Sequence, residues 1–479
     1  MITDNIFIQR KLMTDLTGHL GNPEITMLVG PRQSGKTTIL KKLEAELRAG
    51  GQKTLWLNLD FEDDFCHVSS QGSLLQKINL ELGKNNGVVF IDEIQRKENA
   101  GLFLKGLYDQ NLPWKFVVSG SGSIELKEKI SESLAGRKRI FELSTVSFGE
   151  FVDFRTGYLY TDKLREFFRA EPGKTDQLFR EYLMYGGYPR VVLSETHKEK
   201  LATINEIYRS FLEKDIVYLL RVEKSDSFSN LVKLLASQSG KMVNYSELSA
   251  TLGLSLATVK IYLWYLEKTF IVRKVIPWFT NIRKEITKAP VYYFHDIGLH
   301  NFASGNFGTV TDSEAGFAFQ TVIHAMLKEH FPLADTTIHY WRTKDKAEVD
   351  FVIRRGDVVI PLEVKYRDMK KLEIRRSFRG FLEGYHPEQG YIINKSFNNE
   401  ALVGESRVQC LPYWELMFDT KLHSKAHRGD EEEPTQAYTE VRRGAQRGDN
   451  EGGPMKATWY EDQDILAKSQ ISSNEIVKN

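Results

Sequence analysis

A nine-residue segment near the amino end of the chain carries the residue types that bind phosphate. Residues 30–38 read GPRQSGKTT, with glycines, a lysine and a hydroxyl residue at the spacing of a phosphate-binding loop. Glycines let backbone N–H groups close around phosphate, Lys36 reaches the β- and γ-phosphate oxygens, and the Thr37 hydroxyl ligates Mg²⁺. The predicted nucleotide contacts are Gly30, Pro31, Arg32, Gln33, Ser34, Gly35, Lys36, Thr37 and Thr38.

The flanks of this segment are those that phosphate binding requires. The apolar run of residues 25–29 predicts a buried strand before it, and residues 37–47 predict a helix after it. The amino end of that helix adds partial positive charge next to the phosphates. An ordinary glycine turn is the alternative, but a strand, loop and helix in this order favour a nucleotide site for ATP.

Two carboxylates follow the apolar run VVFI of residues 88–91. The run predicts a buried strand that delivers Asp92 and Glu93 to the carboxyl edge of a parallel sheet, where ligands bind. We expect Asp92 to hold Mg²⁺, directly or through water, and Glu93 to orient and polarise the attacking water. A strand that merely ends in acidic surface residues is the alternative, and the nearby phosphate loop makes it the weaker one.

Two further positions could act on the same phosphates. The apolar strand of residues 115–118 ends in Ser119, whose hydroxyl could sense the γ-phosphate, although Ser121 fits the same pattern. Arg137, in the basic run GRKR, could add positive charge to the transition state within the same chain or from a neighbouring subunit. A solvated basic surface explains that run equally well.

Strand and helix patterns divide the chain into regions that must position these residues. The first alternates apolar runs with helical stretches, which predicts a parallel sheet covered by helices. A region of helical periodicity follows, and then a helix, turn, helix and strand typical of a winged helix, with Gly253 at the turn and Ser255 as an N-cap. The expected units are 1–147 for the nucleotide-binding core, 148–236 for a helical lid, 237–310 for the winged helix, 311–420 for a second α/β domain, and 421–479 for a disordered tail rich in Glu, Arg and Gly.

Several motifs occur together in an order that resembles one family. They are GPRQSGKTT, FIDEIQ, SGS, LAGRKRIFEL with SFGEF, YGGYPR and APVYYFHDIGL. Over about residues 5–419 the chain resembles prokaryotic AAA-plus-type P-loop ATPases fused to a domain of unknown function. The resemblance implies a parallel-sheet α/β ATPase core, with ATP and Mg²⁺ as its ligands, and a carboxyl-terminal α/β domain similar to PD-(D/E)XK restriction endonucleases.

The helix-turn-helix carries little of the chemistry that DNA binding needs. Ala257, Thr258 and Lys260 lie near the start of its second helix, where such a unit reads a groove. Lys260 and Lys268 are the basic residues of that helix, and its aromatic residues are more typical of a packing surface. DNA binding and docking within the molecule both remain open.

A hairpin in the last folded region brings charged residues together. If Gly356 and Asp357 form a two-residue turn, Arg355 pairs with Val358 and Asp350 falls opposite Glu363. The same register places Glu348 opposite Lys365, with all four charged residues on one face of the hairpin.

Asp350, Glu363 and Lys365 match the D…E-x-K pattern of the nuclease superfamily that this region resembles. The resemblance implies that Asp350 and Glu363 hold Mg²⁺, while Lys365 positions water or stabilises phosphate charge. A cross-strand ladder of salt bridges is the alternative. The sequence also departs from the family pattern, because Gln320 stands where a glutamate is usual, and this removes one negative charge.

Composition limits the class of protein and its partners. The net charge of +1 gives no overall field for nucleic acid, and two distant cysteines, Cys66 and Cys410, indicate a reducing compartment. No apolar run reaches membrane-spanning length, so we expect a cytoplasmic protein without membrane contact.

The leading hypothesis is an ATPase whose nucleotide state controls a DNA-associated nuclease-like domain. The alternative is an ATP-dependent switch that binds a protein or DNA partner while its nuclease-like domain is inactive. Asp92 and Glu93, with the strand that follows them, disfavour a P-loop kinase. A homo-oligomer is left open.

Overall fold

The computed structural model describes most of the chain. The described residues are 6–84, 86–121, 134–212, 225–279, 288–309, 311–331 and 336–418. All of them belong to one compact unit that spans residues 1–426. The tail that we expect to be disordered, 421–479, lies outside the described residues. Within them, no helix combines the length and the apolar character that crossing a bilayer requires.

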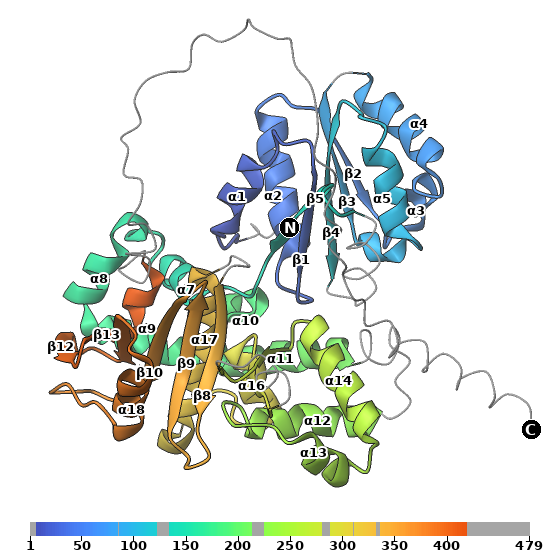
Figure 1. Cartoon of the computed structure of the whole chain (residues 1–479). Helices are drawn as coiled ribbons and strands as arrows, with labels where there is room; N and C mark the ends of the chain where they lie inside the picture. Colours follow the sequence, from blue (N-terminus) through green and yellow to red (C-terminus); the bar gives the residue numbers. More distant parts are fainter. Residues whose placement is uncertain are drawn as a thin grey trace, which may run out of the picture. The chain divides into compact units, whose positions relative to one another are not determined.

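The amino-terminal region is a five-stranded parallel sheet in the order β2-β3-β4-β1-β5. Its strands are β1 (Ile25–Gly30), β2 (Thr54–Asn58), β3 (Gly87–Asp92), β4 (Trp114–Ser121) and β5 (Lys138–Glu142). Its helices are α1 (Leu12–Gly18), α2 (Lys36–Ala49), α3 (Glu62–His67), α4 (Gln71–Leu82) and α5 (Ala100–Tyr108). Two separate apolar clusters hold α1 and α2 on one face and α4 and α5 on the other (Figure 1). The predicted parallel sheet covered by helices is confirmed.

Helices follow the sheet, as the periodicity predicts. They are α7 (Phe148–Arg155), α8 (Leu164–Ala170), α9 (Pro172–Tyr185), α10 (Pro189–Leu193) and α11 (His197–Ser210). Local chemistry sets where they begin. Ser147 and Glu150 form a reciprocal capping box at the start of α7, and Thr196 and Glu199 do the same for α11.

The next region contains the expected helix-turn-helix. Its elements are α12 (Ser225–Ser237), α13 (Tyr245–Leu252), α14 (Leu256–Lys268), β6 (Val272–Val275), β7 (Val291–Phe294) and α16 (Ile297–Ser304). Gly253 ends α13 at φ +62°, and the Ser255 hydroxyl caps α14 by accepting from the N–H of Thr258 at 3.0 Å. β6 and β7 pair antiparallel, and residues 280–287 between them lie outside the described residues. The winged-helix identity therefore stays a prediction.

The last region is a six-stranded mixed sheet in the order β12-β13-β11-β10-β9-β8. Its elements are α17 (Asp312–His330), β8 (Thr336–Arg342), β9 (Glu348–Arg355), β10 (Val358–Val364), α18 (Arg376–Tyr385), β11 (Gln389–Asn394), β12 (Asn399–Val403) and β13 (Ser406–Pro412). Separate apolar clusters pack α17 and α18 against this sheet. In the hairpin, Arg355 pairs with Val358 and Phe351 with Leu362, so the predicted register is confirmed.

The helices of the predicted lid, residues 148–236, belong to two different apolar cores. One joins α7, α8 and α9 to the carboxyl-terminal sheet, and in it the rings of Phe179 and Tyr413 lie tilted at 31° with centroids 3.9 Å apart. The other joins α10 and α11 to α12, α13, α14 and α16. The lid is thus not one packing unit. Periodicity shows which face of a helix is apolar but not which distant element covers that face.

Candidate nucleotide and metal sites

The loop from Gly30 to Gly35 joins β1 to α2 at the carboxyl edge of the parallel sheet (Figure 1). Gly35 has φ +94°, a conformation that side chains disfavour, and it immediately precedes the first residue of α2. At Gly30 a Cβ atom would lie 2.2 Å from the carbonyl oxygen of Leu143. Both glycines are therefore needed for the shape of the loop.

Lys36, the first residue of α2, is buried against this loop. Its ammonium donates hydrogen bonds to the carbonyl oxygens of Gly30, at 3.1 Å, and Pro31, at 2.7 Å. These contacts hold the charge where a nucleotide's phosphates would enter the loop.

Asp92 joins two predicted hydroxyl residues from different elements. The carboxylate is 1% exposed and accepts hydrogen bonds from Thr37 Oγ1, at 2.7 Å, and from the Ser119 hydroxyl on β4. The hydroxyl of Ser119 thus reaches Asp92, while the side chain of the other candidate, Ser121, lies outside what the structure describes. Hydroxyl and carboxylate oxygens are ligands that Mg²⁺ prefers, so Thr37 and Asp92 suit a magnesium ion.

Glu93 follows Asp92 in a left-handed conformation, at φ +57°. Burial raises the pKa of Glu93, the positive charge of Lys36 opposes this, and the charge of Asp92 adds to it. The side-chain amide of Gln95 donates a hydrogen bond to the Glu93 carboxylate and fixes its orientation. A carboxylate with a raised pKa is a better proton acceptor, which suits a residue that activates water.

Arg137 lies at the opposite end of the sheet from the phosphate loop. Its carbonyl oxygen accepts from the N–H of Ile25, the first residue of β1, whereas the loop begins at the last residue, Gly30. Five residues of strand separate the two ends by roughly 17 Å. The guanidinium pairs with Asp109 at 2.7 Å. The predicted role within the same chain is therefore excluded, because parallel pairing of β5 with β1 sets Arg137 at the amino edge.

Sequence reasoning missed two arginines that contact the loop. Arg190 Nη1 donates to Gln33 Oε1 at 3.2 Å, and Glu206 holds the same guanidinium through two bonds of 2.9 and 3.0 Å. Arg10 is buried and donates to the carbonyl oxygen of Ser34 at 3.0 Å. The YGGYPR motif could have pointed to Arg190, whereas no local pattern distinguishes Arg10.

The carboxyl-terminal charged residues also come together, with Gln320 from α17 among them. The Gln320 amide and the N–H of Val364 donate to the two oxygens of Asp350, at 2.9 and 2.7 Å. Lys365 forms an ion pair with Glu363, and Arg375 lies 3.4 Å from the same carboxylate.

The predicted pairing of Glu348 with Lys365 is wrong. Glu348 is exposed and lies 3.4 Å from Arg342, whereas Lys365 is buried against Glu363 on its own segment. The reason is that β10 ends at Val364, and the N–H of Lys365 bonds to Ile393 of β11 instead. A cross-strand salt-bridge ladder is thereby excluded at this pair.

Electrostatics at this second site favour a proton or a cation on the carboxylates. Burial raises the pKa of Asp350 to about 6, the Val364 N–H opposes this, and the charge of Glu363 adds to it. Glu363 is 3% exposed, and its Oε2 atom has no hydrogen-bond partner in the described part of the chain. An orphaned carboxylate oxygen beside Asp350 suits Mg²⁺. Among the described residues, however, no cluster of three or more His, Cys, Asp or Glu side chains forms a metal site.

Comparison with known families finds a match for the amino-terminal region and for two later regions. Residues 22–152 match a family described as an AAA domain. This region is therefore similar to AAA domains. Residues 176–309 and 315–416 match two families described as domains of unknown function, DUF8612 and DUF4143. The match to an AAA domain agrees with the loop geometry of this region, and the families matched by the rest carry no assigned activity.

The chain is similar to uncharacterized proteins of bacteria and archaea. A relative from Mycobacterium tuberculosis is 26% identical over 362 residues, which cover 75% of this chain and 73% of the relative. Another, from Haemophilus influenzae, is 24% identical and covers 71% of this chain and 82% of its own length. Among solved structures, Cdc6p from Pyrobaculum aerophilum aligns at 12% identity over 63% of this chain and 95% of its own, with a TM-score of 0.26. Similarity at that score carries no argument about function.

Proposed function

We propose that the AAA domain binds ATP with Mg²⁺ and hydrolyses it. The observation that supports this most is the position of Asp92, which holds the hydroxyls of Thr37 and Ser119 while Glu93 follows it directly. A bound Mg²⁺ would neutralise charge that develops on the β- and γ-phosphates. Lys36 supplies a second positive charge on the same oxygens, and Glu93 orients the attacking water.

Contacts from outside the AAA domain support a nucleotide-dependent switch. Arg190 reaches Gln33 from α10, which packs into the core of the helix-turn-helix region. Arg10 donates to Ser34 and pairs with Glu150 of α7 at 3.0 Å, and α7 packs into the core of the carboxyl-terminal sheet. A change in the loop on ATP binding or hydrolysis therefore reaches both other regions through buried or charged contacts.

The exposed face of α14 favours a protein partner over DNA. Leu256 is 41% exposed and Ile261 is 49% exposed, whereas Lys260 is the basic residue between them. Phosphate binding needs several cations on such a face. We therefore favour the hypothesis of an ATP-dependent switch that binds a protein partner. Arg137 would act at a phosphate only from a second copy of the chain.

Metal-dependent phosphodiester cleavage is the second candidate function. The orphaned Oε2 atom of Glu363 beside Asp350 supports it, and the neutral amide of Gln320 weakens it. Lys365 would hold charge on a scissile phosphate. We place this activity second because, of the residues that the structure describes, only two carboxylates converge there.

Phosphate release from ATP by the purified full chain, with and without DNA, tests the proposal. Glu93→Gln is expected to keep nucleotide binding and to lower the turnover of ATP by about 10²-fold or more, because water activation is lost. Glu98→Gln, an exposed neighbour, is the matched control and should turn over ATP like wild type. Equal turnover in Glu93→Gln and wild type would remove Glu93 from its assigned role.

A further inference from the structure

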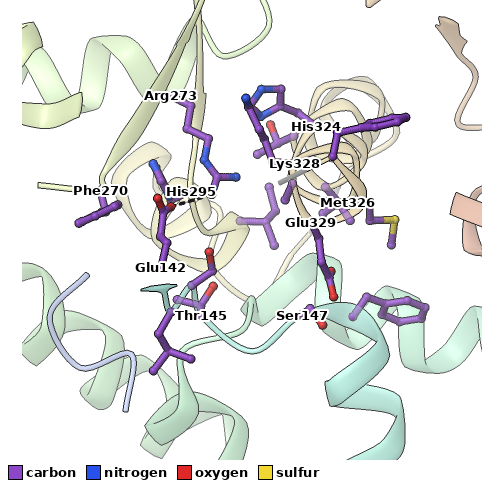
Figure 2. A pocket seen from close by; sticks show the side chains of 18 of the residues that line it. Glu142, Thr145, Ser147, Phe270, Arg273, His295, His324, Met326, Lys328 and Glu329 are labelled. Carbon is purple, nitrogen blue, oxygen red and sulfur yellow. Dashed lines mark ion pairs between the residues drawn. The ribbon is translucent and has the colours of Figure 1, made fainter. Parts of the chain in front are cut away.

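A cavity of about 660 Å³ has no lining residue in common with the phosphate loop or the carboxyl-terminal carboxylates. Its walls include the amino-terminal segment, the segment after β5, strand β6 and helix α17, and Figure 2 shows the side chains of 18 of the residues that line it. Cavities of roughly 300–1,000 Å³ are large enough to enclose small organic ligands.

Three basic side chains of this cavity lack sufficient neutralising partners. Arg273 has one ion pair, with Glu142 at 3.5 Å, which Figure 2 marks with a dashed line. Lys328 makes no hydrogen bond or ion pair with the described residues around it. His324 is 1% exposed, and within the described part of the chain neither ring nitrogen has a hydrogen-bond partner.

These basic groups disfavour one another's charge. Burial lowers the pKa of Lys328, and the positive charge of Arg273 lowers it further, while Glu142 opposes this. Burial also holds the pKa of His324 well below its usual value, and the charges of Arg273 and Lys328 add to the effect. Such a group of cations in a cavity is stabilised when an anion enters.

Two other acids of the cavity wall already have basic partners, while Asp15 and Glu267 also line it. Glu150 pairs with Arg10 at 3.0 Å, and Glu329 lies 3.4 Å from Lys11. At the part of the wall formed by Arg273 and Lys328, Glu142 is the one acid that acts on both among the described residues, so this part carries a local excess of positive charge.

We propose that this cavity binds the phosphate group of a small phosphorylated molecule, held by Arg273, Lys328 and His324. Arg273 supplies a planar fork of N–H donors that matches phosphate oxygens, and Lys328 supplies a compact second charge. The neutral imidazole of His324 donates one hydrogen bond. The carbonyl oxygens of Ser144 and Thr145, two further residues of the cavity wall, hold Arg10, which in turn supports Ser34 of the phosphate loop.

Titration calorimetry with pyrophosphate tests this assignment. The full-length chain carries Lys36→Ala in every sample, so that the phosphate loop contributes little to the heat. We expect saturable binding with one site per chain. Lys328→Gln and Arg273→Gln should each weaken it about tenfold or more, because each removes a charge-assisted contact. Lys260→Gln, an exposed lysine on α14, is the matched control and should bind like the parent.

Inorganic phosphate and AMP, titrated in parallel, distinguish a bare phosphate site from one that also contacts a nucleoside. If either probe binds more tightly than pyrophosphate, and Lys328→Gln weakens that binding by the same factor, the site is supported. Arg273→Lys, which keeps the charge, guards against a folding defect in Arg273→Gln, and thermal unfolding is followed for every variant. Absence of saturable heat with all three probes would overturn the proposal. Unchanged affinity for pyrophosphate in a folded Lys328→Gln variant would also overturn the proposal, because the anion would then bind elsewhere. Neither result would bear on ATP hydrolysis.

Discussion

The side-chain amide of Gln320 donates a hydrogen bond of 2.9 Å to Oδ1 of Asp350. Gln320 stands on α17 where the resemblance to nucleases expects a glutamate, and Asp350 stands on β9. The contact shows that helix and hairpin meet where a third carboxylate would complete an anionic cluster. The neutral amide of Gln320 donates a hydrogen bond to the Asp350 carboxylate, whereas a glutamate at this position would add a negative oxygen that binds a cation.

Gln320→Glu should therefore raise the affinity of the carboxyl-terminal site for Mn²⁺ or Mg²⁺ by about tenfold or more, since it adds a negative oxygen ligand or neighbour. Calorimetry with Mn²⁺ measures this on the full chain, with Lys36→Ala present to reduce binding at the phosphate loop. Asp350→Ala in the same background should reverse the gain. If Gln320→Glu binds Mn²⁺ no better than its parent, the carboxylates do not form a cation site.

DNA nicking with ATP present is a second readout of these variants. Any metal-dependent nicking by this chain should disappear in Asp350→Ala. Nicking that survives this change would arise outside the site.

Stability should depend on pH through Asp350. Its pKa in the folded protein is raised to about 6, whereas an unfolded aspartate titrates near 3.9 (approximate). The folded state thus favours the protonated form, and this stabilisation is present below about pH 4 and is lost as pH rises through about 6, by up to about 3 kcal/mol. Urea unfolding of wild type and Asp350→Asn between about pH 4 and pH 7.5 measures the difference, which should shift in favour of Asp350→Asn as pH rises. Parallel pH profiles would contradict it.

Arg190→Ala should lower kcat/KM for ATP hydrolysis by about 10- to 100-fold, because it removes the cation that contacts the phosphate loop at Gln33. Arg209→Ala changes an exposed arginine on the neighbouring helix α11 and should leave turnover unchanged. A third variant, Glu206→Gln, weakens the ion pair that holds Arg190 and should have a smaller effect. Loss of activity in Arg209→Ala equal to that in Arg190→Ala would indicate a general charge effect.

Gly187→Ala should destabilise the fold by about 1–3 kcal/mol or more, because the added Cβ would lie 2.0 Å from the carbonyl oxygen of Val146. Gly173→Ala is the matched control, since nothing lies within 4 Å of its Cβ position on α9. That control should be neutral or stabilising by up to about 1 kcal/mol. Chemical denaturation measures both, and equal stability of the two variants would show that the backbone at Gly187 can move.

Lys36→Ala should weaken ATP binding by about tenfold or more, since it removes the buried charge held at the carbonyls of Gly30 and Pro31. Lys84→Ala changes an exposed lysine and should bind ATP like wild type. Fluorescence titration with a labelled ATP analogue compares them. Full affinity in Lys36→Ala would place the nucleotide elsewhere.

Local rules were sufficient wherever the partners are close in the chain. The two-residue turn at Gly356 and Asp357 set the hairpin register, and the hydroxyl of Ser255 capped α14 as expected. The register failed at Lys365, because that residue pairs with β11, whose position no local pattern encodes.

The phosphate loop could be identified from the sequence alone because its residues are consecutive and their flanking strand and helix are short-range patterns. Only the tertiary structure brought Arg190 to Gln33, placed Arg137 at the far end of β1, and grouped Arg273, His324 and Lys328 around one cavity. These positions depend on how apolar faces from distant segments pack together. Periodicity reveals that such faces exist, whereas burial against a particular partner decides which side chains meet.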